Sequence, residues 1–222
     1  VDKDMDKLTR LQRGEIPFYE IGLDEIVERN VKEGRLSFSS DLSAAVKTCD
    51  VIFIAVGTPP GKGGEADLSY VWGAAKEIAQ AMPGYRLIVQ KSTVPVGTGA
   101  KIRDLVLKNQ KKKIPFDLAS NPEFLREGSA IEDFMRPDRV VIGTTSRKAE
   151  EILAGIYAPL YLNETPMVRT NVESAELIKY GANAFWSEPG GWEQFTPSLW
   201  IGRNDGAATV KIPPTPPAHS RR

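Results

Sequence analysis

The chain has 222 residues, enough for one complete domain or for one domain and part of another. Hydrophobic residues make up 41% and charged residues 26%, which are ordinary values for a soluble globular protein and exclude a disordered, collagen-like or coiled-coil chain. Because 29 basic residues balance 29 acidic ones, no excess charge indicates a partner, and we expect neither a nucleic-acid nor a membrane partner.

Two amphipathic helices are predicted near the N-terminus. They cover residues 4–13 and 23–33, and each ends before a glycine, Gly14 or Gly34, that suits a left-handed C-cap. From residue 50 onward, short β-branched runs alternate with helix-periodic stretches, which is typical of βαβ units with a parallel sheet. The first of these runs is almost continuously apolar, so we expect it to be a central strand. Strands are expected at residues 50–56, 86–90, 116–119, 139–143 and 167–169.

The clearest helices lie between these strands. One has Asp67 as its expected N-cap and stops at Pro83. Its apolar stripe is Leu68, Val71, Trp72, Ala75, Ile78, Ala79 and Met82. Another begins near Ser146 and is expected to bury Ala149, Ile152, Leu153 and Ile156. The resulting prediction is an α/β fold with a doubly wound, mostly parallel sheet.

The composition changes at Trp186. The last 37 residues contain 6 of the 16 prolines and 3 of the 4 tryptophans, and they show neither a helical nor a strand period. A helical stripe that ends at Phe185 runs into this tail without a cap. A natural flexible tail is one interpretation, and a reading-frame shift or joined foreign sequence near residue 186 is the other. We favour the second, because an exposed tryptophan-rich tail is a poor surface for a soluble protein.

Cysteine and histidine usage limits the chemistry. Cys49 is the only cysteine, so an internal disulfide and a cysteine-built zinc site are excluded, and no metal is expected. His219, the only histidine, lies in the irregular tail, which disfavours a histidine base. No run of ~20 apolar residues could span a bilayer, and no N-terminal signal pattern is present. We therefore expect a cytoplasmic protein, with Cys49 as a small apolar filler before a buried strand.

Polar segments follow several of the predicted strands. Residues 57–64 are glycine-rich and follow the first strand, at the edge where open α/β sheets bind ligands. On composition alone, however, a plain mobile loop is the favoured interpretation of this segment. Residues 90–98 lead from a strand into a helix, and we expect the hydroxyls of Ser92 and Thr93 to point into the crevice. Asp2 precedes the first helix. Such an acid either binds the ribose hydroxyls of NAD and repels the phosphate of NADP, or is an N-cap.

Two further segments carry paired polar residues. Glu123 and Glu127 are four residues apart, so a helical turn would place both carboxylates on one face. A solvated acidic turn with Arg126 as its counterion is the alternative. On the last predicted helix, Lys179 and Asn183 lie off the apolar stripe and could stabilise one oxyanion together, whereas a surface pair of Glu176 with Lys179 is the alternative.

In this order, the segments resemble the nucleotide-sugar dehydrogenases, the UDP-glucose/GDP-mannose dehydrogenase family. The resemblance extends from residue 1 to about residue 185. Residues 136–139, Arg-Pro-Asp-Arg, are more similar to the UDP-glucose branch than to the GDP-mannose branch. The matching stretches are Val1–Asp4, Gly14–Asp24, Val56–Pro59, Lys91–Thr98, Asn121–Gly128, Arg136–Gly143 and Glu173–Tyr180 with Asn183.

The resemblance implies NAD as cofactor and a UDP-sugar as substrate, with oxidation of UDP-glucose to UDP-glucuronate in two hydride transfers through a cysteine thioester. UDP-N-acetylmannosamine or GDP-mannose as substrate, or a non-catalytic nucleotide-binding relic, are the alternatives. The implied cofactor-binding residues are Asp2, Lys7, Thr58, Thr93 and Glu127. The implied catalytic residues are Thr93, Glu123, Glu127, Lys179 and Asn183. The implied substrate-binding residues are Glu123, Phe124, Leu125, Arg126, Glu127, Lys179 and Asn183.

The resemblance also implies a domain plan. Residues 1–170 would form an incomplete, Rossmann-like NAD-binding domain whose sheet lacks its first strand and glycine-rich turn. Residues 171–185 would begin the long connecting helix that forms the dimer in the family, and residues 186–222 would be the irregular tail. Cys49 does not match the nucleophilic cysteine of the family. We therefore expect that this chain derives from such an enzyme, does not turn over by itself, and does not form the normal homodimer or higher oligomer.

Overall fold

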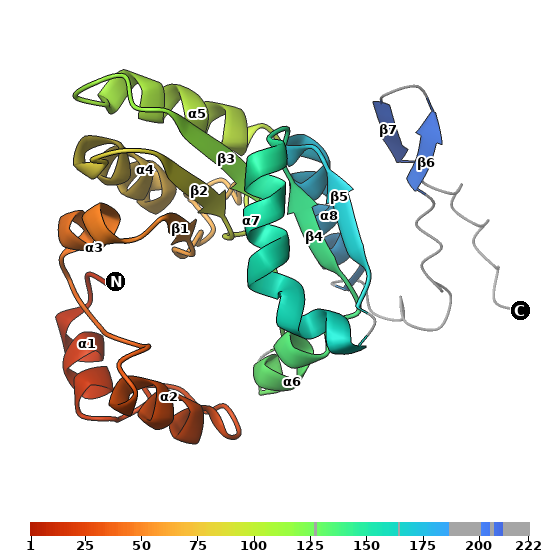
Figure 1. Ribbon diagram of the computed structural model, residues 1–222. Coiled ribbons are helices and arrows are strands. Elements are labelled where there is room, and N and C mark those ends of the chain that lie inside the picture. Colours follow the sequence, from red (N-terminus) through yellow and green to blue (C-terminus); the bar gives the residue numbers. More distant parts are fainter. Residues whose placement is uncertain (127, 164, 187–200, 205–206, 211–222) are drawn as a thin grey trace, which may run out of the picture. The chain divides into compact units, whose positions relative to one another are not determined.

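The computed structural model describes residues 1–126, 128–163, 165–186, 201–204 and 207–210, in two compact units, Val1–Gly181 and Ala182–Arg222 (Figure 1). The helices are α1 (Met5–Gln12), α2 (Leu23–Lys32), α3 (Leu42–Thr48), α4 (Ser69–Ala81), α5 (Thr98–Asn109), α6 (Ala130–Met135), α7 (Arg147–Tyr157), the 3-10 segment η1 (Ala158–Asn163) and α8 (Val172–Trp186). The strands are β1 (Val51–Ile54), β2 (Arg86–Gln90), β3 (Phe116–Ser120), β4 (Val140–Gly143), β5 (Met167–Thr170), β6 (Ile201–Asn204) and β7 (Ala207–Val210).

The first unit contains a five-stranded sheet in the order β1-β2-β3-β4-β5. Its neighbouring strands pair in parallel, except that β3 and β4 meet antiparallel through Ser120 and Gly143. All five predicted strands are present, with ends that differ by at most two residues from the prediction. The predicted α/β class with a mostly parallel sheet is therefore confirmed.

Helices cover both faces of this sheet. Ile88 of β2 packs with residues of α4 and α5 in one buried cluster, whereas its neighbours Leu87 and Val89 pack with residues of α7 in another. This alternation follows from the period of two residues in a strand, which points successive side chains to opposite faces. Every residue of β2 is buried, and β2 and β3 both contribute side chains to the two clusters. The sheet is thus doubly wound.

The expected central position of β1 was wrong. β1 pairs with β2 alone among the described strands and forms an edge of the sheet. Ile54 is buried, but Phe53 remains 36% exposed. An apolar run indicates burial on two faces but does not determine how many strands pair with it.

The predicted helices were largely confirmed. The apolar stripe of α4 is buried or packed against the core. The helix begins at Ser69, however, and its N-cap is Leu68 instead of the expected Asp67. The Asp67 carboxylate accepts a hydrogen bond from the backbone nitrogen of Ser69. In α7, Ser146 is the N-cap as expected, but Ile156 is 45% exposed and Tyr157 is buried instead. Both positions suit the helical period, and Tyr157 reaches the core with its ring while its hydroxyl donates to Asn121.

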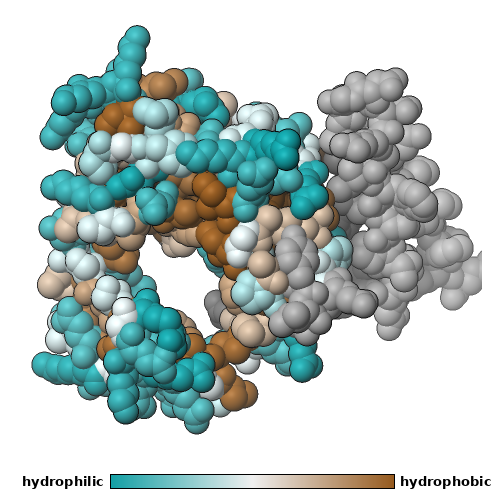
Figure 2. Space-filling model, viewed as in Figure 1, coloured by the Kyte–Doolittle hydropathy of each residue, from teal (hydrophilic) through white to brown (hydrophobic). Residues whose placement is uncertain are grey.

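The helices α1 and α2 contribute little to the core. Leu8 is the one buried residue of α1, and α2 has none. Figure 2 accordingly shows mostly hydrophilic residues over both helices, at the lower left of the view. Gly14 and Gly34 have positive φ angles, of 80° and 70°, which confirms the predicted glycine stops.

Two other expectations were not met. Cys49 is exposed at the C-terminal end of α3, so it is not an apolar filler. In the second unit, β6 and β7 pair antiparallel, although no strand period was recognised there. The sequence does place Asp-Gly between these strands, which is a hairpin signal. Most of the tail lies outside the described residues, so the proposed junction near residue 186 stays a prediction.

No described helix combines the length and the apolar character that a bilayer crossing requires.

Arg86 leads to a testable prediction about stability. It is 8% exposed, and its guanidinium donates to the carbonyl oxygens of Val46 at 2.8 Å, Lys47 at 2.8 Å and Tyr85 at 2.7 Å. Arg86→Met leaves these carbonyls without their charged donor, so we expect a loss of about 2–4 kcal/mol in the free energy of unfolding. Urea unfolding measures this loss. Arg147→Met, which removes a 92% exposed side chain in one ion pair, is the control and should cost less than ~0.5 kcal/mol. Equal costs would contradict the prediction.

Candidate functional site

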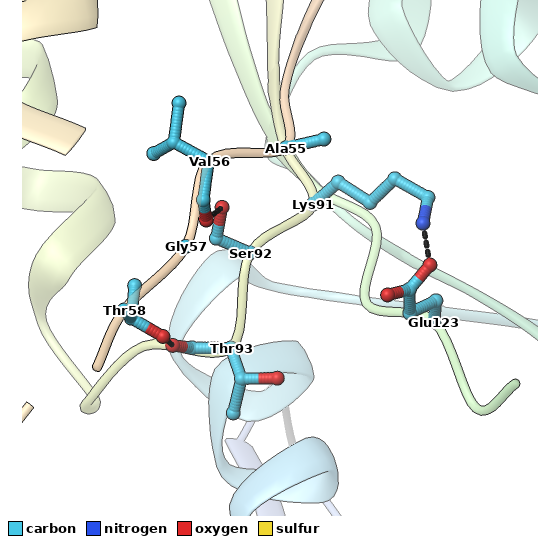
Figure 3. A pocket seen from close by; sticks show the side chains of 8 residues that line it. All are labelled: Ala55, Val56, Gly57, Thr58, Lys91, Ser92, Thr93 and Glu123. Carbon is cyan, nitrogen blue, oxygen red and sulfur yellow. Dashed lines mark hydrogen bonds and ion pairs between the residues drawn. The ribbon is translucent and has the colours of Figure 1, made fainter. Parts of the chain in front are cut away.

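A pocket of about 280 Å³ lies at the carboxyl ends of the first three strands (Figure 3). Its lining comes from the segments that follow β1, β2 and β3. Because parallel strands end at the same edge, these segments meet there although they are far apart in the sequence. The lining residues are Ala55, Val56, Gly57, Thr58, Lys91, Ser92, Thr93 and Glu123.

Hydroxyl groups join two of these segments. The Thr58 hydroxyl donates to the carbonyl oxygen of Thr93 at 2.9 Å, and the Ser92 hydroxyl donates to that of Val56 at 2.6 Å. Ser92 therefore lines the pocket, but its proton is used to hold the loop after β1. The Thr93 hydroxyl has no hydrogen bond to any described residue, so it is available to a ligand. Of the two hydroxyls expected to face the crevice, the Thr93 hydroxyl is therefore the one that can donate a hydrogen bond to a ligand.

Two lysines and a carboxylate gather beside the pocket. Lys91 forms an ion pair with Glu123. Burial lowers the pKa of Lys91, and the positive charge of Lys179 lowers it further. Burial also lowers the pKa of Lys179. The Lys179 ammonium lies 5.2 Å from the centre of the Phe124 ring. Lys91, Glu123, Phe124 and Lys179 thus form one cluster, which we call the lysine cluster.

The segment that contains Glu123 is not a helical turn, because residues 121–126 have no helical structure. The expected common face of Glu123 and Glu127 is therefore not formed by this part of the chain, and Glu127 itself lies outside the described residues. The exposed Arg126 is not a counterion of Glu123 either. Its guanidinium donates to Asp133 at 2.6 Å and 3.1 Å and thereby lowers the pKa of Asp133 to about 2. Leu125 is half-buried in the same segment.

Glu176 has a different role from either expectation. It does not pair with Lys179, because its side chain is 2% exposed and accepts hydrogen bonds from the backbone nitrogens of Gly97 and Gly99, both at 2.7 Å. Lys179 is thereby left to the lysine cluster. Asn183 follows on α8 but belongs to the second unit, so the expected joint action with Lys179 stays a prediction.

Asp2 and Lys7 form a separate pair at the N-terminus. The Lys7 ammonium lies 2.7 Å from Asp2, and this hydrogen bond, with one from the backbone of Asp4, lowers the pKa of Asp2. Asp4, rather than Asp2, is the N-cap of α1. The N-cap interpretation of Asp2 is therefore wrong, and its carboxylate is ionised and partly exposed. Neither residue lines the pocket.

Lys91 and Arg139 are the site residues that the sequence analysis did not single out. The Arg139 guanidinium lies 6.0 Å from the centre of the Phe124 ring, the same ring that Lys179 contacts. Both residues occupy the matching stretches named above, and Lys91 is the first residue after β2, which was the available signal. Within the described part of the chain, no group of three histidine, cysteine, aspartate or glutamate side chains could hold a metal ion.

The NAD binding domain model of the UDP-glucose/GDP-mannose dehydrogenase family matches residues 1–161. The chain belongs to this family. It is 52% identical over 188 residues to the UDP-glucose 6-dehydrogenase of Rhizobium meliloti, an alignment that covers 83% of this chain and 43% of the relative. The chain thus spans less than half the length of this relative. NAD, the cofactor expected from the sequence, is also the cofactor of the matched family domain.

Solved structures agree with the fold and the family. A UDP-glucose dehydrogenase from Pyrobaculum islandicum is 42% identical with a TM-score of 0.77, and the match covers 81% of this chain and 42% of that one. A GDP-mannose dehydrogenase from Pseudomonas aeruginosa is 35% identical with a TM-score of 0.80, and the match covers 84% of this chain and 44% of that one. The Rossmann-like fold of the first unit is therefore that of nucleotide-sugar dehydrogenases.

Proposed function

We propose that this chain is part of an NAD-dependent UDP-glucose 6-dehydrogenase, which oxidises UDP-glucose to UDP-glucuronate. The observation that carries the proposal is the lysine cluster, which puts two cations and one carboxylate beside a hydroxyl-lined pocket at the strand ends. The choice of sugar is supported by the 42% identity to the solved UDP-glucose dehydrogenase, against 35% to the solved GDP-mannose dehydrogenase.

The residues present fit NAD at two places. Asp2 is ionised and partly exposed, so it can accept hydrogen bonds from ribose hydroxyls, and Lys7 orients it. Thr58 and Thr93 lie in the pocket, where the Thr93 hydroxyl is available to donate. NAD, when bound, accepts the hydride that leaves the sugar carbon. We assign Glu127 to the cofactor and the substrate as well, as the family resemblance implies.

In the proposed mechanism, Lys179 stabilises the negative charge that develops on the sugar oxygen as the hydride leaves. A cation that is half-buried does this better than one in water, because the effective dielectric constant is lower. Asn183 supports the same oxygen. Glu123 exchanges protons with the alcohol and with water, and Lys91 holds its carboxylate in place. Phe124, Leu125 and Arg126 lie along the path of the sugar nucleotide.

The overall reaction takes four electrons from the C6 alcohol. Two NAD molecules each accept one hydride, and one water supplies the second oxygen of the carboxylate. After the first hydride transfer we propose that a cysteine thiolate adds to the aldehyde and forms a thiohemiacetal. The second hydride transfer oxidises this adduct to a thioester, and water then hydrolyses the thioester to the carboxylate and the free thiol. Cys49 cannot serve this step, since it precedes β1 whereas the pocket follows it. We further propose that the chain works in the cytoplasm and does not by itself assemble as the intact family does.

A chimera tests the proposal. The matching segment of the Rhizobium meliloti relative is replaced by that of this chain, and the product is assayed for NADH formation from UDP-glucose. Because 52% of the aligned residues are identical, we expect the rate to stay within about tenfold of that of the relative, which is a barrier change of roughly 1.4 kcal/mol.

The control for folding is the circular dichroism spectrum and NAD binding of the same chimera. A folded chimera that binds NAD and yields no NADH would contradict the proposed chemistry. Rates with UDP-N-acetylmannosamine and GDP-mannose, measured alongside, show whether the grafted segment relaxes the choice of sugar.

A further inference from the structure

Glu176 is a buried carboxylate for which the proposed mechanism has no use. It lies on α8, three residues before Lys179, so the two residues are about one helical turn apart. Its two oxygens accept from the backbone nitrogens of Gly97 and Gly99, each at 2.7 Å. Gly97 is the N-cap of α5, and Gly99 is the second residue of this helix. A charged acceptor with two donors of this kind is a strong, directional contact.

The surroundings of Glu176 leave little freedom to α8. A Cβ atom on Gly99 would collide with Val172 and lie 3.3 Å from the carboxylate of Glu176. A Cβ atom on Gly143 would lie 2.5 Å from the Cβ of Ala175 and 2.6 Å from the carbonyl oxygen of Asn171. The first turns of α8 therefore sit directly against the backbones of α5 and β4, because glycines occupy both contact points.

The two hydrogen bonds of Glu176 connect the chain segment that carries Lys91 to the helix that carries Lys179. Residues 91–97 run from the end of β2 to the start of α5 and carry Lys91 and Thr93. The far end of this segment is the backbone that Glu176 holds, at Gly97 and Gly99. Lys179 is on the helix that supplies Glu176. Together with the glycine contacts of α8, the Glu176 carboxylate therefore helps to fix where the helical turn that carries Lys179 lies relative to the segment that carries Lys91.

We propose that Glu176 is a positioning residue: its ionised side chain holds α8 against the segment 91–97 and so places the Lys179 ammonium over Phe124 and next to Lys91. The proposal rests on the proposed function only in so far as it calls the lysine cluster a reaction site. Burial and the nearby charge of Glu173 raise the pKa of Glu176, and the hydrogen bonds from the two backbone N–H groups offset only part of this rise.

The test measures the pKa values of Lys91 and Lys179 in the purified chain, without NAD or sugar, by competitive acetylation at a series of pH values and mass spectrometry. Glu176→Gln keeps the shape but can accept only through one oxygen. If α8 moves away, Lys179 becomes hydrated, and its pKa should rise toward that of an ordinary lysine. The pKa of Lys91 should rise with it, because part of its lowering comes from Lys179.

Two other variants complete the experiment. Glu173→Gln removes an exposed carboxylate from the same helix and should leave both lysine pKa values unchanged. Glu176→Asp keeps the charge, but its shorter side chain cannot reach both nitrogens, so an intermediate shift is expected. In the chimera, Glu176→Gln should lower kcat at least tenfold and leave the KM for NAD nearly unchanged.

Three results would overturn the proposal. Unchanged lysine pKa values in a folded Glu176→Gln variant would mean that Glu176 does not position Lys179. A fall in the pKa of Lys179 would mean that Glu176 acts on it through its charge alone. Failure of both Glu176 variants to fold would mean that Glu176 serves the fold as a whole. Since no readout in the purified chain needs turnover, an inactive chimera would count against the proposed function and not against this role of Glu176.

Discussion

The purified 222-residue chain, mixed with NAD and UDP-glucose, is expected to give no continuing production of NADH. The proposed second oxidation needs a thiolate beside the sugar, and the only cysteine of the sequence is Cys49. Cys49 lies before β1, whereas the pocket begins at Ala55, so roughly 20 Å of extended chain separates them. We expect a rate at least about 10³-fold below that of an enzyme with its nucleophile in place.

The measurement is the absorbance of NADH over many turnovers, with the Rhizobium meliloti relative as the positive control under the same conditions. Cys49→Ser should give the same result as the unchanged chain. Steady production of NADH by the purified chain would refute the prediction. Production that disappears in Cys49→Ser would show in addition that this thiol reaches the substrate.

In the chimera, Lys179→Ala is expected to reduce kcat by about 10²–10³ with little change in the KM for NAD, because the lost cation acts mainly on charge that develops in the transition state. Lys179 is half-buried against Phe124, so water cannot replace it fully. The same reasoning gives a pH dependence. Burial lowers the pKa of Lys179, and the rate should fall as rising pH removes its proton at that lowered pKa.

Lys101→Ala is the matched control for this prediction, since Lys101 is exposed on α5 and should leave kcat within about twofold. The pH profile adds a second check, because the fall at high pH should be absent from the residual activity of Lys179→Ala. A Lys179→Ala chimera with normal kcat would remove the lysine cluster from the mechanism.

Features that repeat along the chain could be predicted from the sequence. The period of two residues in β2 and of 3.6 residues in α4 determines which side chains face the core, so strands, helices and fold class followed from short windows. The glycine stops after α1 and α2 were equally local. The pattern of polar residues after strands pointed to Thr93 and Glu123, and the family resemblance added Thr58; all three line one pocket.

The tertiary structure alone decided which of these residues are partners. Arg126 bonds to Asp133 and leaves Glu123 to Lys91, and Glu176 bonds to backbone nitrogens 77 and 79 residues away instead of to Lys179. The edge position of β1 was also a matter of strand order. A local period reports burial but not the identity of a neighbour, because hydrogen bonds and ion pairs between distant segments depend on how the whole sheet brings their ends together.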